Sequence, residues 1–129
     1  VGPPTLLPPS LVGWPVEVSH DLDEVLPTVD VCYILRIQQE RMQEALIPTL
    51  REYTMGYGLT ARRLARLGSE AIIMHPGPMN RGVEISPEAA DSPNAMIVDQ
   101  VANGVSVRMA VLFTLLGSGT QLDSLREDR

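Results

Sequence analysis

The stretch Ala71-Ile72-Ile73-Met74-His75-Pro76-Gly77-Pro78 joins a short apolar run to a proline-rich turn. An apolar run of this kind is typical of a strand buried in a parallel sheet, and proline and glycine clusters end such strands. A second run, Asp30-Val31-Cys32-Tyr33-Ile34-Leu35, is rich in β-branched and aromatic residues and stops abruptly at Arg36. The two runs predict strands over 71–74 and 30–35, the latter buried on both faces.

Helix signals surround the two predicted strands. Acidic residues after His20 suit the first turn of a short helix that ends near Leu26. Pro48 can begin a helix running to about residue 55, and Thr60 can cap a second short helix over 61–67. A third strand is expected over 16–18, where apolar and polar residues alternate, and residues 79–90 are expected to be irregular.

A long helix is expected in the last third of the chain. Asp91 or Ser92 followed by Pro93 is a helix-start signal, and the helix should end near Gly117. Its apolar stripe, spaced mainly by four residues, consists of Ile97, Val101, Val105, Leu112 and Leu116.

Short buried strands that alternate with helices predict an α/β fold. We expect a three-layer Rossmann-like domain with a parallel sheet covered by helices on both faces. With three strands at most, and with Val1 opening a proline-rich segment, the fold is expected to be incomplete at its N-terminus. The domain should span residues 1–119 without its first strand and helix, followed by a disordered polar tail over 120–129.

Composition narrows the classes of function. The chain has 129 residues with 44% hydrophobic content, enough for one domain, and its net charge of −6 argues against a nucleic-acid partner. No stretch approaches the roughly 18 consecutive apolar residues of a membrane span, so no membrane partner is expected. The single cysteine, Cys32, gives no sign of an oxidising compartment, and the cytoplasm is the default location. All ten basic residues are arginine, which suits bidentate recognition of carboxylates or phosphates.

The turn over residues 75–78 offers hydrogen-bond acceptors. Because proline has no N–H, only Gly77 can donate from Pro76-Gly77-Pro78, while every carbonyl can accept. Such a turn suits a ligand rich in N–H donors, such as an amine or a carbamoyl NH2 group. The alternative is a plain turn that ends a strand.

Arg36 and Gln38 follow the first predicted strand at its carboxyl end, where open parallel sheets bind ligands. If the backbone stays extended there, both side chains point to one side and could grip one carboxylate together. The alternative for Arg36 is a solvated loop residue. The acidic cluster that follows His20 is assigned to the helix start, so no metal site is expected. The standard nucleotide-binding patterns are missing from the sequence, so no cofactor is expected either.

Three separate segments, 31–41, 75–85 and 100–110, resemble aspartate carbamoyltransferase, in the order and spacing of that family. The similarity runs to about Leu116 and covers only the family's C-terminal, aspartate-binding domain. It implies transfer of a carbamoyl group from carbamoyl phosphate to the amine of L-aspartate in pyrimidine biosynthesis. It also implies a homotrimer for the intact protein, with regulatory or dihydroorotase partners left open.

The resemblance assigns roles to individual residues. Arg36 and Gln38 match the contacts to L-aspartate, and Gly77 and Pro78 match contacts to carbamoyl phosphate. Pro76 and Gly77 match positions whose carbonyls bind the carbamoyl NH2 group and the incoming amine. The family's bond at Gly77-Pro78 is typically cis. The groups that hold the phosphate belong to the family's N-terminal domain, so no catalytic residue is assigned here and this chain alone should be inactive.

Two alternatives remain open. Ornithine carbamoyltransferase is a relative that usually has cysteine at the position of Pro76, and Pro76 together with Arg36-Ile37-Gln38 favours aspartate. The other alternative is a non-catalytic binding or scaffolding relative, against which the preserved site motifs argue.

Overall fold

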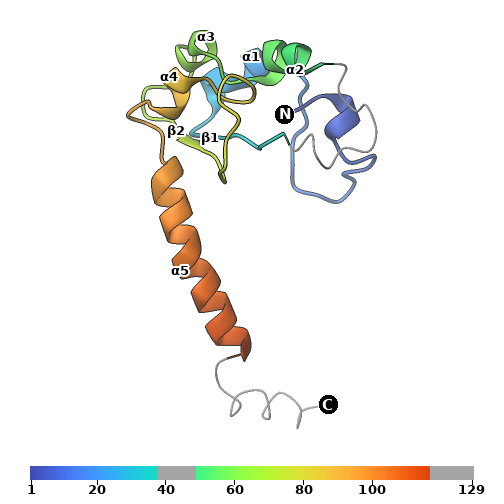
Figure 1. The fold of residues 1–129 in the computed structure, drawn as a ribbon. Coiled ribbons are helices and arrows are strands. Elements are labelled where there is room, and N and C mark those ends of the chain that lie inside the picture. Colours follow the sequence, from blue (N-terminus) through green and yellow to red (C-terminus); the bar gives the residue numbers. More distant parts are fainter. Residues whose placement is uncertain (38–48, 117–129) are drawn as a thin grey trace. The chain divides into compact units, whose positions relative to one another are not determined.

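The computed structural model describes residues 1–37 and 49–116, which fall into two compact units, Val1–Ile97 and Val98 onward. Gln38 and Pro48, and the predicted tail over 120–129, lie outside the described residues. Figure 1 shows the elements in chain order. They are η1 (Pro4–Leu6), α1 (Leu22–Val25), η2 (Leu26–Thr28), β1 (Val31–Tyr33), α2 (Leu50–Tyr57), α3 (Ala61–Leu64), β2 (Ile72–Met74), α4 (Pro87–Ala90) and α5 (Ile97–Leu116).

β1 and β2 form a parallel pair, which confirms the two strands expected from the sequence and the α/β class. Val31 pairs with Ile72, and Tyr33 with Met74. The other edge of β2 is also hydrogen-bonded: the Ile73 amide donates to Asn94 (2.9 Å), and its carbonyl accepts from the Met96 amide (2.9 Å). β2 therefore lies at the centre of the first unit.

β1 is buried on one face, and the expectation that both faces are buried was wrong. Cys32 and Ile34 pack into the core, whereas Val31 and Tyr33 are 47% and 53% exposed. Successive side chains of a strand point to opposite faces, so one face of β1 meets the core and the other is uncovered by the described residues.

The strand expected over 16–18 is not formed. The Val16 amide donates to the Trp14 carbonyl two residues earlier (2.9 Å), so a local turn uses the backbone group that a ladder would need.

Capping side chains set the starts of the short helices. Asp21, Thr49, Thr60 and Ser86 accept backbone N–H groups at the starts of α1, α2, α3 and α4. The predicted cap at Thr60 is confirmed, although α3 ends at Leu64 rather than 67. α2 begins at Leu50, where the Thr49 side chain caps it, and ends at Tyr57.

Two predictions in the second half of the chain were wrong at the element boundaries. Residues 79–90 are not wholly irregular, since Ser86 and Pro87 start α4. The long helix is confirmed but starts at Ile97, not near Pro93, because residues 94–96 hydrogen-bond along the edge of β2 instead.

The core of the first unit consists of apolar side chains from both strands and from the segments around them. Its buried members are Leu26, Cys32, Ile34, Leu59, Ile73, Ile85, Ala89 and Ile97. None of the helices in the described ranges is long and apolar enough to cross a membrane.

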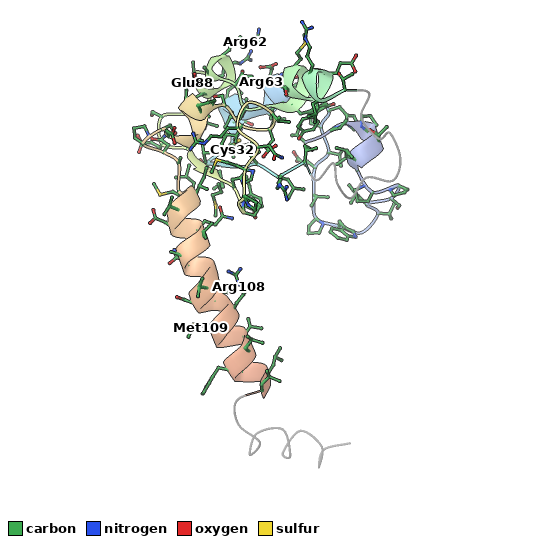
Figure 2. The ribbon with its side chains drawn as sticks, in the orientation of Figure 1. Cys32, Arg62, Arg63, Glu88, Arg108 and Met109 are labelled. Carbon is green, nitrogen blue, oxygen red and sulfur yellow. The ribbon has the colours of Figure 1, made fainter. Side chains whose placement is uncertain are left out.

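Arg63 is a buried charged side chain that links α3 to α1. It is 5% exposed and donates from Nε and Nη2 to Asp23 (3.2 and 2.9 Å) and from Nη1 to the Gly58 carbonyl (2.9 Å). Figure 2 shows Arg62 and Arg63 on α3, with Cys32 deeper in the same unit. The position of Asp23 is thus set by a buried guanidinium.

Candidate functional site

The carboxyl ends of β1 and β2 bring two predicted site segments to one edge of the sheet. Because the strands are parallel and the Ile34 amide donates to the Met74 carbonyl (2.9 Å), Arg36 and His75 both follow at the same end. This is the edge at which open parallel sheets bind ligands. The shared edge expected from the sequence is therefore confirmed, and the ligand roles of the residues on it stay predictions.

The turn over residues 75–78 has the predicted backbone. The Gly77-Pro78 bond is cis, and Gly77 has a φ of +60°, in the left-handed region that glycine adopts readily. Pro76 and Pro78 are exposed and Gly77 is half-buried. The Gly77 amide donates to His75 Nδ1 (2.9 Å), so the turn's one N–H is used internally. Within residues 1–37 and 49–116, no donor reaches the carbonyl oxygens of Pro76 or Gly77. The turn therefore presents acceptors.

His75 and Glu84 form a fully buried pair behind the turn. Both side chains are 0% exposed, and His75 Nε2 lies 3.2 Å from Glu84 Oε1. Since Nδ1 accepts the Gly77 amide, the ring proton must lie on Nε2, which donates to the glutamate. The same carboxylate oxygen accepts the Asn80 amide (2.5 Å). The pair holds the backbone at Gly77, between the two prolines, and at Asn80, after them.

The Asn80 side chain connects the turn to the Arg36 segment. Its Nδ2 donates to the Ile37 carbonyl at 3.1 Å, across 43 positions of sequence. Ile37 is buried, and Arg36 beside it is half-buried. A direct hydrogen bond therefore holds the two strand-end segments together. Gln38 lies outside the described residues, so its predicted place beside Arg36 stays a prediction.

Glu84 and Asn80 were not singled out from the sequence. Both lie in the Met79-Asn80-Arg81-Gly82-Val83-Glu84-Ile85 segment, which reads as loop because glycine and polar residues dominate it. Glu84 alternates with Val83 and Ile85, and this alternation predicts an exposed carboxylate, so no local signal marks it as buried. Its burial depends on His75 and on the Asn80 amide, which a local pattern does not show.

Burial raises the pKa of two nearby groups. The Cys32 thiol has a pKa of about 11 because of burial, so it is protonated at neutral pH and unreactive. Burial, with added repulsion from the charge of Glu84, raises the pKa of Tyr53 to about 12. In the described part of the chain, no group of three or more His, Cys, Asp or Glu side chains could hold a metal ion.

Comparison with known proteins gives one consistent family. Residues 11–115 match the family model described as the Asp/Orn-binding domain of aspartate/ornithine carbamoyltransferase. A catalytic subunit of aspartate carbamoyltransferase from Acidothermus cellulolyticus is 61% identical over 92% of this chain and 37% of its own length. The corresponding subunit from Desulfitobacterium hafniense is 54% identical over 93% of this chain and 38% of its own length.

Solved structures agree with these relatives. Aspartate transcarbamoylase from Trypanosoma cruzi, in complex with carbamoyl phosphate and aspartate, is 32% identical with a TM-score of 0.60, covering 74% of this chain and 30% of its own. Ornithine carbamoyltransferase from Thermus thermophilus is 28% identical with a TM-score of 0.61, covering 76% of this chain and 31% of its own. The chain thus spans little more than a third of the length of the two curated catalytic subunits.

Proposed function

This chain belongs to the aspartate/ornithine carbamoyltransferase family, and we propose that it is the amino-acid-binding part of an aspartate carbamoyltransferase. The complete protein transfers the carbamoyl group of carbamoyl phosphate to the amine of L-aspartate. The products are N-carbamoyl-L-aspartate and phosphate, in pyrimidine biosynthesis. The observation that carries the proposal is the shared strand edge at which Arg36 and the acceptor turn are joined by the Asn80–Ile37 hydrogen bond.

The charge of the site favours aspartate over ornithine as the acceptor. Aspartate has two carboxylates, whereas ornithine has one carboxylate and a second amine. A guanidinium at the strand end attracts the second carboxylate of aspartate, which it can bind through paired donors, and repels the positively charged second amine of ornithine. The relatives at 54–61% identity are named for aspartate, whereas the ornithine enzyme of Thermus thermophilus is 28% identical.

The turn would act on the reacting nitrogen atoms. The carbonyls of Pro76 and Gly77 accept N–H bonds from the carbamoyl NH2 group and the aspartate amine, and Gly77 and Pro78 border the carbamoyl phosphate. The amine lone pair attacks the carbamoyl carbon, the bond to the phosphate oxygen breaks, and the amine loses a proton. Catalysis comes from holding the two reactants in line, while the groups that bind phosphate belong to the rest of the complete protein.

Replacing Arg36 tests the assigned carboxylate contact. In the complete protein, Arg36→Ala should lower kcat/KM for L-aspartate about 10- to 100-fold, since a charge-assisted hydrogen bond is worth about 1.5–3 kcal/mol. The KM for carbamoyl phosphate should change little. Steady-state assays of carbamoyl-aspartate formation measure both parameters.

Arg51→Ala is the matched control, because Arg51 is an exposed arginine on α2. It should leave both parameters unchanged. An unchanged dependence on aspartate in Arg36→Ala would refute the role of Arg36. Carbamoylation of L-ornithine with no carbamoylation of L-aspartate would instead favour the ornithine enzyme, and binding without turnover would favour a non-catalytic relative.

The wider setting is part of the same proposal. The domain spans residues 1–119, the assembly is a homotrimer, and the location is cytoplasmic. A regulatory subunit or a dihydroorotase is the candidate partner. Support comes from the relatives named as catalytic subunits of aspartate carbamoyltransferase.

We also propose that the domain's first strand and helix, from polypeptide that precedes Val1, cover the exposed face of β1. That face lines a cavity of about 350 Å³ together with apolar side chains of α1 and α2 and with Val1 itself. Among its lining residues are Leu22, Val25, Val31, Tyr33, Tyr53 and Tyr57.

A further inference from the structure

We infer that His75, Glu84 and Asn80 form one positioning network that aims the acceptor turn and holds it against the Arg36 segment. The inference rests on the proposed function, because it assigns these residues to the same site. None of the three needs to touch substrate. His75 acts through the Gly77 amide, Glu84 through the His75 ring, and Asn80 through the Ile37 carbonyl beside Arg36.

His75 sets the direction of the Pro76 carbonyl. The carbonyl of Pro76 and the amide N–H of Gly77 belong to one trans peptide, in which the two groups point in opposite directions. Because His75 Nδ1 accepts the Gly77 N–H at 2.9 Å, the Pro76 carbonyl must point away from His75. His75 therefore aims the acceptor that the proposed function assigns to the substrate nitrogen.

Glu84 holds the His75 ring in place. Its ring could turn about the Cα–Cβ and Cβ–Cγ bonds if Nε2 had no fixed partner. Glu84 Oε1 supplies that partner at 3.2 Å and is itself held by the Asn80 amide at 2.5 Å. The Glu84 backbone is anchored as well, since its carbonyl accepts the Leu59 amide (2.9 Å) in the buried core. The ring is thus fixed to the rigid part of the unit.

Asn80 connects the network to the Arg36 segment. Asn80 uses its amide for Glu84 and its side chain for the Ile37 carbonyl at 3.1 Å. Ile37 directly follows Arg36, so this bond sets where the backbone of Arg36 lies relative to the turn. One chain of hydrogen bonds therefore runs from Gly77 through His75, Glu84 and Asn80 to the Arg36 segment.

A matched pair of asparagine variants separates positioning from general stability. In the complete protein, Asn80→Ala should raise the KM for L-aspartate about 3- to 10-fold, as expected when one neutral hydrogen bond is lost, with kcat changed less than about twofold. Asn94→Ala is the control, because Asn94 Nδ2 also donates to backbone carbonyls, those of Ser69 and Ala71, but at the opposite end of β2. It should lower the Tm without changing this KM. Equal effects of the two variants on KM, or no effect of Asn80→Ala, would overturn the inference.

A second pair tests the aim of the Pro76 carbonyl. His75→Asn keeps a side-chain acceptor near the position of Nδ1, whereas His75→Gln keeps a donor near Nε2 and loses the acceptor for Gly77. The Gln variant should therefore lose about tenfold more kcat/KM than the Asn variant. Its Gly77 amide should also exchange with solvent about ten times faster, as measured by hydrogen exchange.

The exchange measurement does not depend on catalysis, so the two proposals can fail separately. If the wild-type protein transferred no carbamoyl group, the proposed function would be refuted. The exchange rate of the Gly77 amide would still decide whether the network exists. Equal exchange of the Gly77 amide in the two His75 variants would refute the network even in an active enzyme.

Discussion

Gly58 is a residue whose missing side chain the fold requires. Its backbone is extended (φ −70°), so conformational freedom is not the reason for glycine there. A Cβ at this position would lie 2.6 Å from the Val83 carbonyl oxygen and 2.8 Å from that of Thr54. Both neighbours are backbone atoms, and the adjacent Leu59 amide is bonded to Glu84 (2.9 Å). The close approach therefore supports the segment that carries the site's buried carboxylate.

We expect Gly58→Ala to destabilise the protein by about 1–3 kcal/mol, because the backbone must move to admit a methyl group. Gly56→Ala, two residues earlier in α2, is the matched control, since a Cβ there meets nothing within 4 Å. It should stabilise the protein by about 0.5–1 kcal/mol, as alanine usually does in a helix. Urea unfolding of both variants checks this, and a stabilised Gly58→Ala would contradict the close contact.

Asp23 should contribute to stability in a pH-dependent way. The pKa of Asp23 lies below the ordinary value of 3.8. The largest cause is its hydrogen bond with Arg63, and the positive charges of Arg63, Arg62 and Arg66 add to it. A carboxyl with a depressed folded-state pKa stabilises fully above the unfolded value and loses this effect as the pH falls through the folded one. Asp23→Asn should therefore be clearly less stable than wild type at neutral pH, with the gap closing below about pH 3.8.

Urea midpoints at a series of pH values measure that gap. Asp30→Asn is the control, because Asp30 is exposed and its backbone carbonyl, not its side chain, bonds to Ile72. A constant gap between wild type and Asp23→Asn at all pH values would show that packing, not charge, accounts for the effect.

At the scale of elements, helices and strands that depend on a few neighbouring residues could be predicted from the sequence. Pairings between segments that are distant in the sequence could not. Thr60 and the run ending at Met74 carry their own signals, and both elements form as expected. The prediction of a strand over 16–18 was wrong because alternating apolar and polar residues do not show whether a neighbouring strand is there to pair with. The start of α5 was misplaced because residues 94–96 bond to β2, a contact that Pro93 does not reveal.

The candidate site divides in the same way. The acceptor turn and its place beside Arg36 could be predicted, since proline chemistry is local and parallel strands share their ends. The His75–Glu84 pair and the Asn80–Ile37 bond could not, because each joins residues whose proximity only the folded chain creates. The role of Gln38 remains a prediction.

At the scale of the whole molecule, the described residues include the proposed contact to the amino acid and the acceptor turn, and no phosphate contact is assigned to them outside the turn. We expect calorimetric titration of this chain alone with L-aspartate to show weak or no binding, and mixtures with carbamoyl phosphate to release no phosphate above the uncatalysed rate. The complete protein is the positive control. Micromolar binding of aspartate by the chain alone would mean that its affinity needs no further domain.

The uncovered face of β1 gives a second prediction at this scale. Tyr33 is 53% exposed and lines the cavity that we assign to polypeptide preceding Val1. If that segment covers it, Tyr33→Ser should change the stability of this chain alone by less than about 1 kcal/mol, because little apolar area is lost there. In the complete protein the same change removes a buried aromatic ring and should cost about 3–5 kcal/mol.

Met55→Ser is the control, since Met55 is 68% exposed and lies outside the cavity lining, and it should have a small effect in both forms. Equal costs of Tyr33→Ser in the two forms would mean that this face stays open to solvent, and the preceding segment would have to pack elsewhere.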